Sequence, residues 1–135
     1  MIKHIVTAIL SHKNKILIVK RSQKVKTFPG QWSGIIGYLE KCDLNPYERT
    51  IIEINEETSI IINNFTLVKY IPKIDLSDNS EILWIVHPFL FNVVNPNITL
   101  NWENEKYKWI LPNEITCYLT VPQLDLILSI LLRNQ

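Results

Sequence analysis

The chain has little net charge, few cysteines and no long apolar run, and each of these absences excludes a class of protein. Its formal net charge is +1 in 135 residues, so no overall field draws it to nucleic acid or to an anionic membrane. Its apolar runs are shorter than the roughly 20 residues that a membrane-spanning helix requires. Its first residues lack the pattern of a signal peptide. We therefore expect a cytoplasmic protein that binds neither membrane nor DNA.

Cysteine is scarce, with two residues far apart in the sequence, Cys42 and Cys117. They fit no C-x-x-C pattern, so we expect reduced thiols without a redox or zinc-binding role. The composition is otherwise ordinary for a globular protein, with 47% hydrophobic and 20% charged residues. A length of 135 residues fits one compact domain, and we expect residues 1–135 to form it.

The predicted elements run from strands to one early helix, back to strands and then to a closing helix. Apolar, β-branched segments predict strands at residues 2–10, 15–21, 32–39, 65–71, 82–94 and 107–111. The polar segment from Asp75 to Ser80 is a predicted loop, and His87-Pro88 indicates an edge strand or a bulge. An amphipathic pattern predicts the final helix from Val121 to Leu132, with an apolar stripe formed by Leu124, Ile127, Leu128 and Leu131. This order predicts an α+β fold, a mixed β-sheet with helices packed on it.

A helix start at Asn45 is the clearest local signal in the chain. Asn45 has the side chain of an N-cap, Pro46 lies at the first helical position, and Glu48 at the third completes a capping box. The residues on one side of this helix should face the core, and they are Tyr47, Ile51, Ile54 and Thr58. We expect the glutamates of the helix to take the opposite side.

Three glutamates of this helix, Glu53, Glu56 and Glu57, are spaced at i, i+3 and i+4. Each residue advances about 100° around a helix, so these carboxylates fall within an arc of roughly 100°. Like charges this close destabilise an isolated helix. A divalent cation would reverse that penalty, because Mg²⁺ and Mn²⁺ prefer hard oxygen ligands. The spacing indicates a metal site, and the alternative is a solvated, charged helix face.

The segment from Gly37 to Ile60 resembles the Nudix box. That family motif reads Gly, five residues, Glu, seven residues, then Arg-Glu-apolar-x-Glu-Glu-x-Gly-apolar, and here the second half reads Ile-Glu-Ile-Asn-Glu-Glu-Thr-Ser-Ile from Ile52. Residues 15–21 with 30–34, and later residues 101–115, are similar to the family's segments before and after the box. The resemblance covers most of the chain and implies the Nudix fold, an α/β/α sandwich with a mixed sheet.

The box departs from the family pattern at several positions. The distance from Gly37 to Glu53 is one residue too long, and Asp43 lies near the place of the first box glutamate. Ile52 replaces an arginine that, in the family, orients a metal-binding glutamate through an ion pair. Arg49 stands one helical turn before Glu53, so it could reach that carboxylate instead.

A serine, Ser59, replaces the glycine at which family members leave the helix. Glycine is favoured there because it adopts positive φ without strain. Serine can make the same exit only with strain, or it must leave the helix by a different path. This loss and the loss of the arginine at Ile52 bear on catalysis more than on the fold.

Nudix enzymes hydrolyse a nucleoside diphosphate linked to another group, usually with Mg²⁺. The resemblance implies that Glu53, Glu56 and Glu57 hold Mg²⁺ (or Mn²⁺) and take part in catalysis, with water as the nucleophile. A further catalytic carboxylate would come from a later loop, where Glu103 is preferred over Glu105. The alternative for these last two residues is ordinary surface charge near a turn.

Substrate-binding residues are predicted in and beside the loop that precedes the box. The positive charges of Arg21, Lys24 and Lys26 could meet phosphates, although a solubilising loop is an equal alternative. Gly37 is a further predicted substrate-binding residue. Five aromatic residues could stack on a base or could instead belong to the core: Phe28, Trp32, Trp84, Trp102 and Trp109. His87 is predicted to be a structural histidine.

These observations leave two main hypotheses for the function. The first is a Mg²⁺-dependent hydrolase that cleaves a pyrophosphate bond in a nucleoside di- or triphosphate or a related derivative. The second is a catalytically weak or inactive nucleotide-binding protein of the same fold, which the substitutions Ile52 and Ser59 motivate. An isoprenyl diphosphate isomerase ranks last, because its paired Cys and Glu are not evident here. Homodimers are common in the family, so a homodimer is a further expectation.

Overall fold

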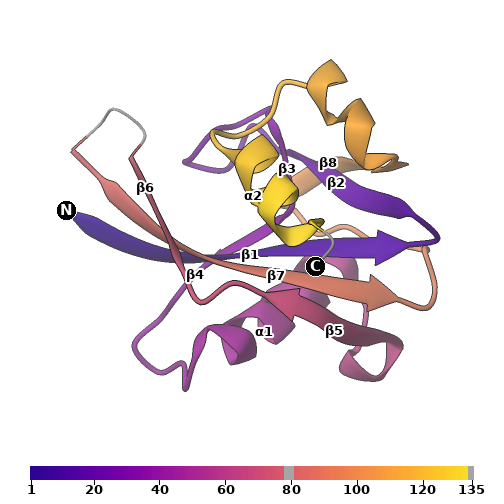
Figure 1. Ribbon diagram of the computed structural model, residues 1–135, viewed down its shortest axis with the longest axis horizontal. Coiled ribbons are helices and arrows are strands. Elements are labelled where there is room, and N and C mark those ends of the chain that lie inside the picture. The colour runs from indigo at the N-terminus through magenta and orange to yellow at the C-terminus, as the bar shows by residue number, and fades with distance from the viewer. Residues whose placement is uncertain (78–80, 134–135) are drawn as a thin grey trace.

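The computed structural model describes residues 1–77 and 81–133 and, within them, an eight-stranded mixed sheet with a helix on each face (Figure 1). The strands are β1 (Ile2–His12), β2 (Lys15–Arg21), β3 (Trp32–Ser33), β4 (Ile35–Tyr38), β5 (Phe65–Tyr70), β6 (Ile74–Ser77), β7 (Leu83–Val93) and β8 (Asn104–Ile110). The helices are α1 (Pro46–Thr58) and α2 (Leu124–Leu131), with 3₁₀ turns η1 (Ile62–Asn64) and η2 (Pro112–Cys117). The predicted α+β fold is confirmed.

Strands β1 and β7 form the centre of the sheet as a long parallel pair, from Ile2 opposite Leu83 to Ser11 opposite Asn92. On its other side β1 pairs with β4 and then with β2, both antiparallel. Strands β3 and β8 extend the sheet from β2, and β5 and β6 extend it from β7. The arrangement brings the start of β8 beside the end of β2, which are far apart in the sequence.

Of the two alternatives predicted at His87-Pro88, an edge position or a bulge, the edge position was wrong, because β7 has partners on both sides. Its partner changes at this point from β6, which pairs with residues 83–86, to β5, which pairs with residues 89–93. The Pro88 carbonyl accepts a hydrogen bond from the Ile71 backbone N–H in the connection between these strands. Pro88 has no backbone N–H to donate, and it lies at the point where the partner strand of β7 changes. The sheet therefore tolerates proline inside a central strand.

Two other predicted boundaries differ from the structure. Residues 75–77 of the predicted loop belong to β6, while residues 78–80 lie outside the described part of the chain. The last helix begins at Leu124 rather than at Val121, because Gln123 adopts a left-handed conformation with φ 68° and serves as its N-cap. Local periodicity does not register such a backbone reversal, which explains the longer prediction.

The side chains of the sheet alternate between two cores, one under each helix. In β1, Val6, Ala8 and Leu10 pack toward α1 with Ile54, whereas Ile9 packs toward α2. The predicted apolar stripe of α2 is confirmed, because its four members are buried: Leu124, Ile127, Leu128 and Leu131. None of the helices within the described residues has the length and apolar content needed to cross a membrane.

Helix α1 begins as the sequence predicts, but its glutamates are placed differently. The Asn45 side chain accepts a hydrogen bond of 2.9 Å from the Glu48 backbone N–H. Glu53 and Glu57 are buried, so the prediction that the glutamates lie opposite the core was wrong for these two residues. A buried pair of acids is costly unless it has partners or a cation, and helix periodicity alone does not anticipate it.

Candidate metal and substrate site

Three carboxylates from two distant parts of the chain converge on one point. Glu53 and Glu57 lie one turn apart on α1, and Glu103 comes from the residue before β8. One oxygen from each of the three lies within 4.8 Å of the others. The backbone carbonyl of Glu103 also accepts a hydrogen bond of 2.9 Å from the Ser22 N–H, which ties this loop to the end of β2. The pairing of β8 with β2 thus delivers Glu103 to the helix.

Burial and mutual repulsion shift the pKa values of these acids upward. The Glu57 side chain belongs to a residue that is 1% exposed, and this burial raises its pKa well above the usual range, with Glu103 and Glu53 adding to the shift. For Glu53, burial first and then the charges of Glu103 and Glu56 raise the pKa to about 7. Negative charge in this cluster therefore needs a cation beside it.

One oxygen of Glu57 has a partner and the other does not. The Asn104 side-chain amide donates a hydrogen bond of 2.7 Å to Glu57 Oε1. Glu57 Oε2 is buried and has no hydrogen-bond partner among the residues that the structure describes. A buried carboxylate oxygen without a donor is costly. A divalent cation among the three carboxylates would satisfy it with the hard oxygen ligands that Mg²⁺ and Mn²⁺ prefer, so the donor set fits such an ion.

Gly37 makes room for the Glu53 carboxyl group. A Cβ atom built on Gly37 would lie 2.3 Å from the Glu53 side chain, closer than real Cβ contacts allow. Gly37 lies in β4 and pairs with Val6 of β1, so the strand cannot easily move away. The sequence predicted a substrate-binding role for Gly37, and the structure instead places it directly against the carboxylate cluster.

Arg49 supplies the positive charge that the box arginine would carry and that Ile52 lacks. Its guanidinium donates to both Asp43 carboxylate oxygens, at 2.9 and 3.0 Å, and lies 3.7 Å from Glu53. These hydrogen bonds hold the pKa of Asp43 below its usual range. Ile52 itself is 40% exposed. The predicted contact between Arg49 and Glu53 is confirmed.

The remaining predicted carboxylates lie at the margin of the cluster or away from it. Glu56 is exposed and is not one of the three converging acids, although its charge contributes to the raised pKa of Glu53. Glu105 is exposed and pairs with Lys20 at 3.6 Å. The structure therefore places Glu103 in the cluster and Glu105 outside it, whereas the sequence supported only a preference for Glu103.

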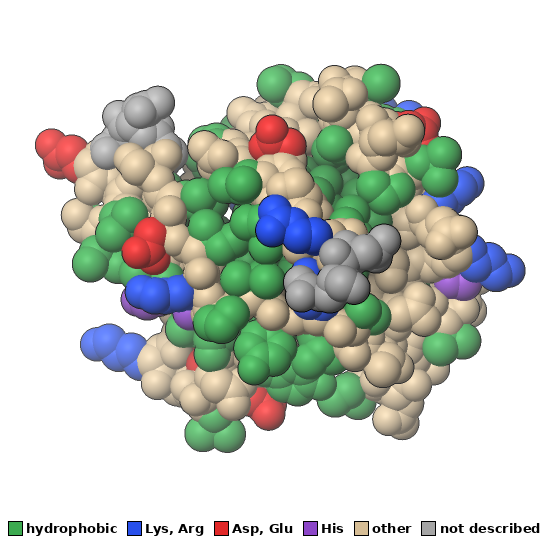
Figure 2. All heavy atoms as spheres, viewed as in Figure 1, with side chains coloured by type: hydrophobic (Ala, Val, Ile, Leu, Met, Phe, Trp, Pro, Cys, Tyr) green, Lys and Arg blue, Asp and Glu red, His purple; other side chains and the backbone are tan. Residues whose placement is uncertain are grey.

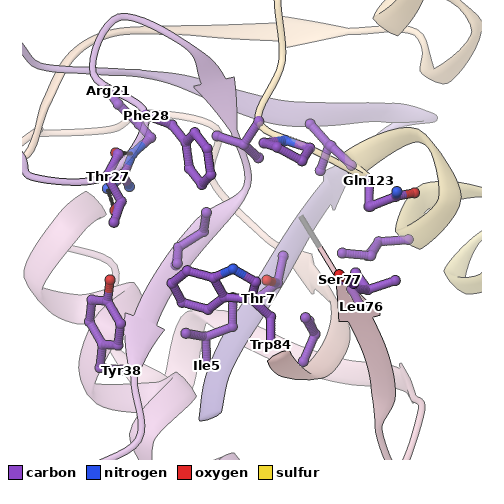
Figure 3. A pocket seen from close by; sticks show the side chains of 16 residues that line it. Ile5, Thr7, Arg21, Thr27, Phe28, Tyr38, Leu76, Ser77, Trp84 and Gln123 are labelled. Carbon is purple, nitrogen blue, oxygen red and sulfur yellow. Dashed lines mark hydrogen bonds between the residues drawn. The ribbon is translucent and has the colours of Figure 1, made fainter. Parts of the chain in front are cut away.

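A largely apolar pocket of about 700 Å³, open solvent at its mouth included, lies on the α2 side of the sheet. Hydrophobic side chains gather on the face of the molecule that α2 partly covers (Figure 2). The labelled side chains around the pocket come from β1, the end of β2 and the loop after it, β4, β6, β7 and the residue before α2 (Figure 3). Phe28 and Arg21 line it, as does Trp84, whereas the predicted Lys24 is exposed and does not.

Arg21 lies where this pocket approaches the carboxylates. Burial lowers the pKa of Arg21, and the charges of Glu57 and Glu103 partly offset this effect. Its Nε donates a hydrogen bond of 2.8 Å to the Thr27 carbonyl, and its Nη2 donates one of 3.0 Å to the Thr27 hydroxyl. Arg21 is thus an organised, buried cation between the pocket and the acids rather than a flexible surface charge.

The other aromatic candidates divide into structural and exposed residues. Trp32 packs edge-on against Tyr118. Trp109 Nε1 donates a hydrogen bond of 2.9 Å to the Pro96 carbonyl. Trp102 is 62% exposed. His87 contacts a second histidine and the Pro72 carbonyl, as expected of a structural histidine.

Sequence reasoning missed Asn104 in the carboxylate cluster and most of the pocket lining, Thr27 and Tyr38 included. Asn104 could have been suspected from its place beside Glu103. Thr27 and Tyr38 carry no signal of this kind, because their places in the pocket lining arise from the fold.

Comparison with known proteins identifies the domain type. The family model of the NUDIX domain matches residues 2–128. The fold is similar to a Caenorhabditis elegans Ap4A hydrolase in a binary complex, with a TM-score of 0.78 at 16% identity over 94% of this chain and 93% of that one. It is also similar to a MutT protein from Methanosarcina mazei Go1, with a TM-score of 0.74 at 19% identity over 95% and 91%.

A third similar structure is the NUDIX domain of Shewanella oneidensis NrtR complexed with ADP ribose. Its TM-score is 0.74 at 14% identity, and the match covers 93% of this chain and 83% of that one. At such identities these likenesses show the fold alone. No sequence among the curated proteins matches the chain.

Proposed function

Because the chain belongs to the NUDIX domain family, we propose that it is a metal-dependent hydrolase that cleaves a pyrophosphate bond in a nucleotide derivative. The observation that carries the proposal is the convergence of Glu53, Glu57 and Glu103 within 4.8 Å, together with a buried Glu57 Oε2 that has no hydrogen-bond partner among the described residues. A solvated charged helix face, the alternative reading of the glutamate spacing, would not bury two of its acids. The arrangement is what a site for a hard divalent cation requires.

The three converging carboxylates would hold the metal, and Glu56 at the exposed side is a fourth candidate ligand. When bound, Mg²⁺ or Mn²⁺ would withdraw charge from phosphate oxygens and lower the pKa of a bound water. The protein's own part is to orient the acids. Arg49 fixes Glu53, and Asn104 fixes Glu57.

The substrate class follows from what lies next to the carboxylates. The pocket beyond Arg21 is apolar and partly aromatic, which suits a nucleoside more than a purely ionic group. The family resemblance and the ADP-ribose bound in one similar structure support a nucleotide derivative as the substrate. The diphosphate would lie toward the acids, where the positive charge of Arg21 and of the metal would offset its own.

The rival proposal is an inactive nucleotide-binding protein, motivated by the substitutions at Ile52 and Ser59. Both losses are offset within the fold. Arg49 makes the ion pair with Glu53 from one turn earlier, and Ser59 adopts the left-handed exit with φ 65° that glycine would normally supply. These two observations favour hydrolysis over binding alone.

The test is release of phosphate or pyrophosphate from a nucleotide panel by the purified protein with Mg²⁺ or Mn²⁺. Turnover should be lost in Glu57→Gln, because the amide removes the charge at the centre of the cluster. Glu105→Gln is the matched control and should keep wild-type turnover, since Glu105 lies outside the cluster. Nucleotide binding without turnover of any substrate would favour the rival.

A further inference from the structure

The third carboxylate of the cluster is held differently from the other two. Glu53 and Glu57 are buried on α1, whereas Glu103 is half-buried in the turn before β8. A helix fixes the backbone of its residues through a regular ladder of hydrogen bonds, and a turn lacks such a ladder. Glu103 therefore depends on individual contacts for its place in the cluster.

Backbone contacts anchor the loop that carries Glu103 on both sides of the turn. Upstream, the Thr99 N–H donates a hydrogen bond of 3.1 Å to the Thr58 carbonyl at the end of α1. The Ser59 hydroxyl donates one of 3.2 Å to the Thr99 carbonyl. Downstream, the Ser22 N–H donates to the Glu103 carbonyl at 2.9 Å. These contacts fix the path of the chain, but they do not involve the Glu103 side chain.

The side chain of Asn101 holds both the backbone and the carboxyl group of Glu103. Asn101 Oδ1 accepts a hydrogen bond of 3.0 Å from the Glu103 N–H, which closes an Asx turn. Asn101 Nδ2 donates one of 3.3 Å to Glu103 Oε1. The amide of Asn104 holds Glu57 Oε1 in a similar way, at 2.7 Å. Two amides of the same short segment thus restrain the rotation of two carboxyl groups of the cluster.

An Asx turn can also serve only to shape a loop, and the chain offers an example for comparison. Asn95 Oδ1 accepts a hydrogen bond of 2.9 Å from the Asn97 N–H, the same turn six residues earlier. The residue two positions after Asn95 is an asparagine, so that turn holds no carboxylate. The second hydrogen bond, from Asn101 Nδ2 to Glu103, is not needed to shape the loop. It acts on the group that enters the cluster.

We infer that Asn101 is a positioning residue that holds the Glu103 carboxylate in place for the metal ion. This role rests on the proposed function, since it requires a cation bound by the three converging acids. Asn101 acts through Glu103 and is not itself a metal ligand. A partner that orients a ligand in this way contributes about 10- to 100-fold to metal affinity, because the ligand is aligned before the ion binds.

The test is Mn²⁺ binding to the full-length protein, followed by electron paramagnetic resonance. Asn101→Ser keeps a side-chain oxygen that can accept from the Glu103 N–H, and it removes the amide that donates to the carboxylate. The Kd for Mn²⁺ should rise about tenfold. Asn95→Ser is the matched control, because it makes the same change in a turn without a carboxylate, and its Kd should equal that of the wild type.

A double-mutant cycle separates positioning of Glu103 from a general effect on the loop. In a Glu103→Ala background the carboxyl group is gone, so adding Asn101→Ser should change the Kd for Mn²⁺ by less than about twofold. If Asn101 only shaped the loop, the substitution would weaken binding by the same factor in both backgrounds. Equal factors in the two backgrounds would overturn the inference.

Failure of this inference can be distinguished from failure of the proposed function. If Asn101→Ser and Asn95→Ser bind Mn²⁺ as tightly as the wild type, the positioning role is overturned whatever the hydrolysis assay shows. Absence of Mn²⁺ binding by the wild type would overturn the positioning role and the metal site together. If Asn101→Ser weakens Mn²⁺ binding through Glu103 but the wild type hydrolyses no nucleotide, the positioning role stands and the hydrolase proposal fails.

Discussion

Arg49 and Glu53 lie one turn apart on α1, with Arg49 Nη1 3.7 Å from Glu53 Oε1. The family places an arginine directly before this glutamate, where the present chain has Ile52. The same Arg49 side chain is held by two hydrogen bonds to Asp43 in the loop before the helix. The chain thus supplies the orienting cation from a different turn of the helix and fixes it from a second direction.

Replacing Arg49 should therefore impair catalysis through the loss of its ion pair with Glu53. Arg49→Gln is expected to lower kcat/KM by about ten- to a hundredfold, the usual effect of removing a partner that orients a metal ligand. The control is Lys20→Gln, which breaks the exposed pair with Glu105 and should change little. Steady-state kinetics decides, and equal effects of the two substitutions would contradict the orienting role.

Ser59 is predicted to be a strained end of α1. A non-glycine residue at φ 65° carries a cost of about 1–2 kcal/mol, which glycine would remove at some cost in chain entropy. Ser59→Gly should raise the free energy of unfolding by about 0.5–1 kcal/mol in urea titrations. Ser59→Ala keeps the strain and loses the hydrogen bond to the Thr99 carbonyl, so it should be slightly destabilising. A destabilised Ser59→Gly would show that the serine conformation is not strained.

The buried acids should make stability depend on pH in the metal-free protein. Folding raises the pKa of Glu53 from 4.5 to about 7, so the folded state binds more protons than the unfolded state between these values. The free energy of unfolding should consequently fall as pH rises from 4.5 to 7. In EDTA at pH 8, the free energy of unfolding of Glu53→Gln should exceed that of the wild type by on the order of 2 kcal/mol. At pH 4.5 the difference should vanish.

Urea titrations at the two pH values measure this effect, and Mn²⁺ supplies the second half of the test. Addition of Mn²⁺ at pH 8 should stabilise the wild type, because the ion binds the folded state, and should stabilise Glu53→Gln much less. Parallel pH profiles for the wild type and the variant would show that the Glu53 carboxyl group is not destabilised by burial.

A methyl group at Gly37 should displace the Glu53 carboxyl group. Gly37→Ala places a Cβ 2.3 Å from that side chain, and the pairing of β4 with β1 limits any backbone shift. We expect weaker Mn²⁺ binding and a large loss of turnover, with the fold retained by circular dichroism. Glu105→Gln is the control, because Glu105 lies outside the carboxylate cluster and should keep wild-type Mn²⁺ binding. Unchanged Mn²⁺ affinity in Gly37→Ala would contradict the tight packing of Gly37 on Glu53.

The parts of the fold that depend on local chemistry were predictable from the sequence. The Asn45 cap, the strands β1 and β2 and the apolar stripe of α2 each follow from residue types at fixed spacing. Family membership was also within reach, because the second half of the box is contiguous. The long-range parts were not predictable, and Pro88 shows why: its place in a central strand depends on two partner strands that change beside it.

The candidate site likewise has residues that the sequence identified and features that depend on long-range contacts. Glu53 and Glu57 were identified by helix spacing, but their burial depends on the space that Gly37 leaves and on the amide of Asn104. Glu103 could be preferred over Glu105 from the sequence, whereas its arrival at the helix depends on the pairing of β8 with β2.

The central claim is that Glu53, Glu57 and Glu103 together form one metal site. The most direct measurement is Mn²⁺ binding by electron paramagnetic resonance, in which the signal of free Mn²⁺ falls as the ion binds. Wild type and Glu105→Gln should bind with the same affinity, and Glu103→Gln should bind at least about tenfold more weakly. Equal affinity of Glu103→Gln and Glu105→Gln would contradict the claim.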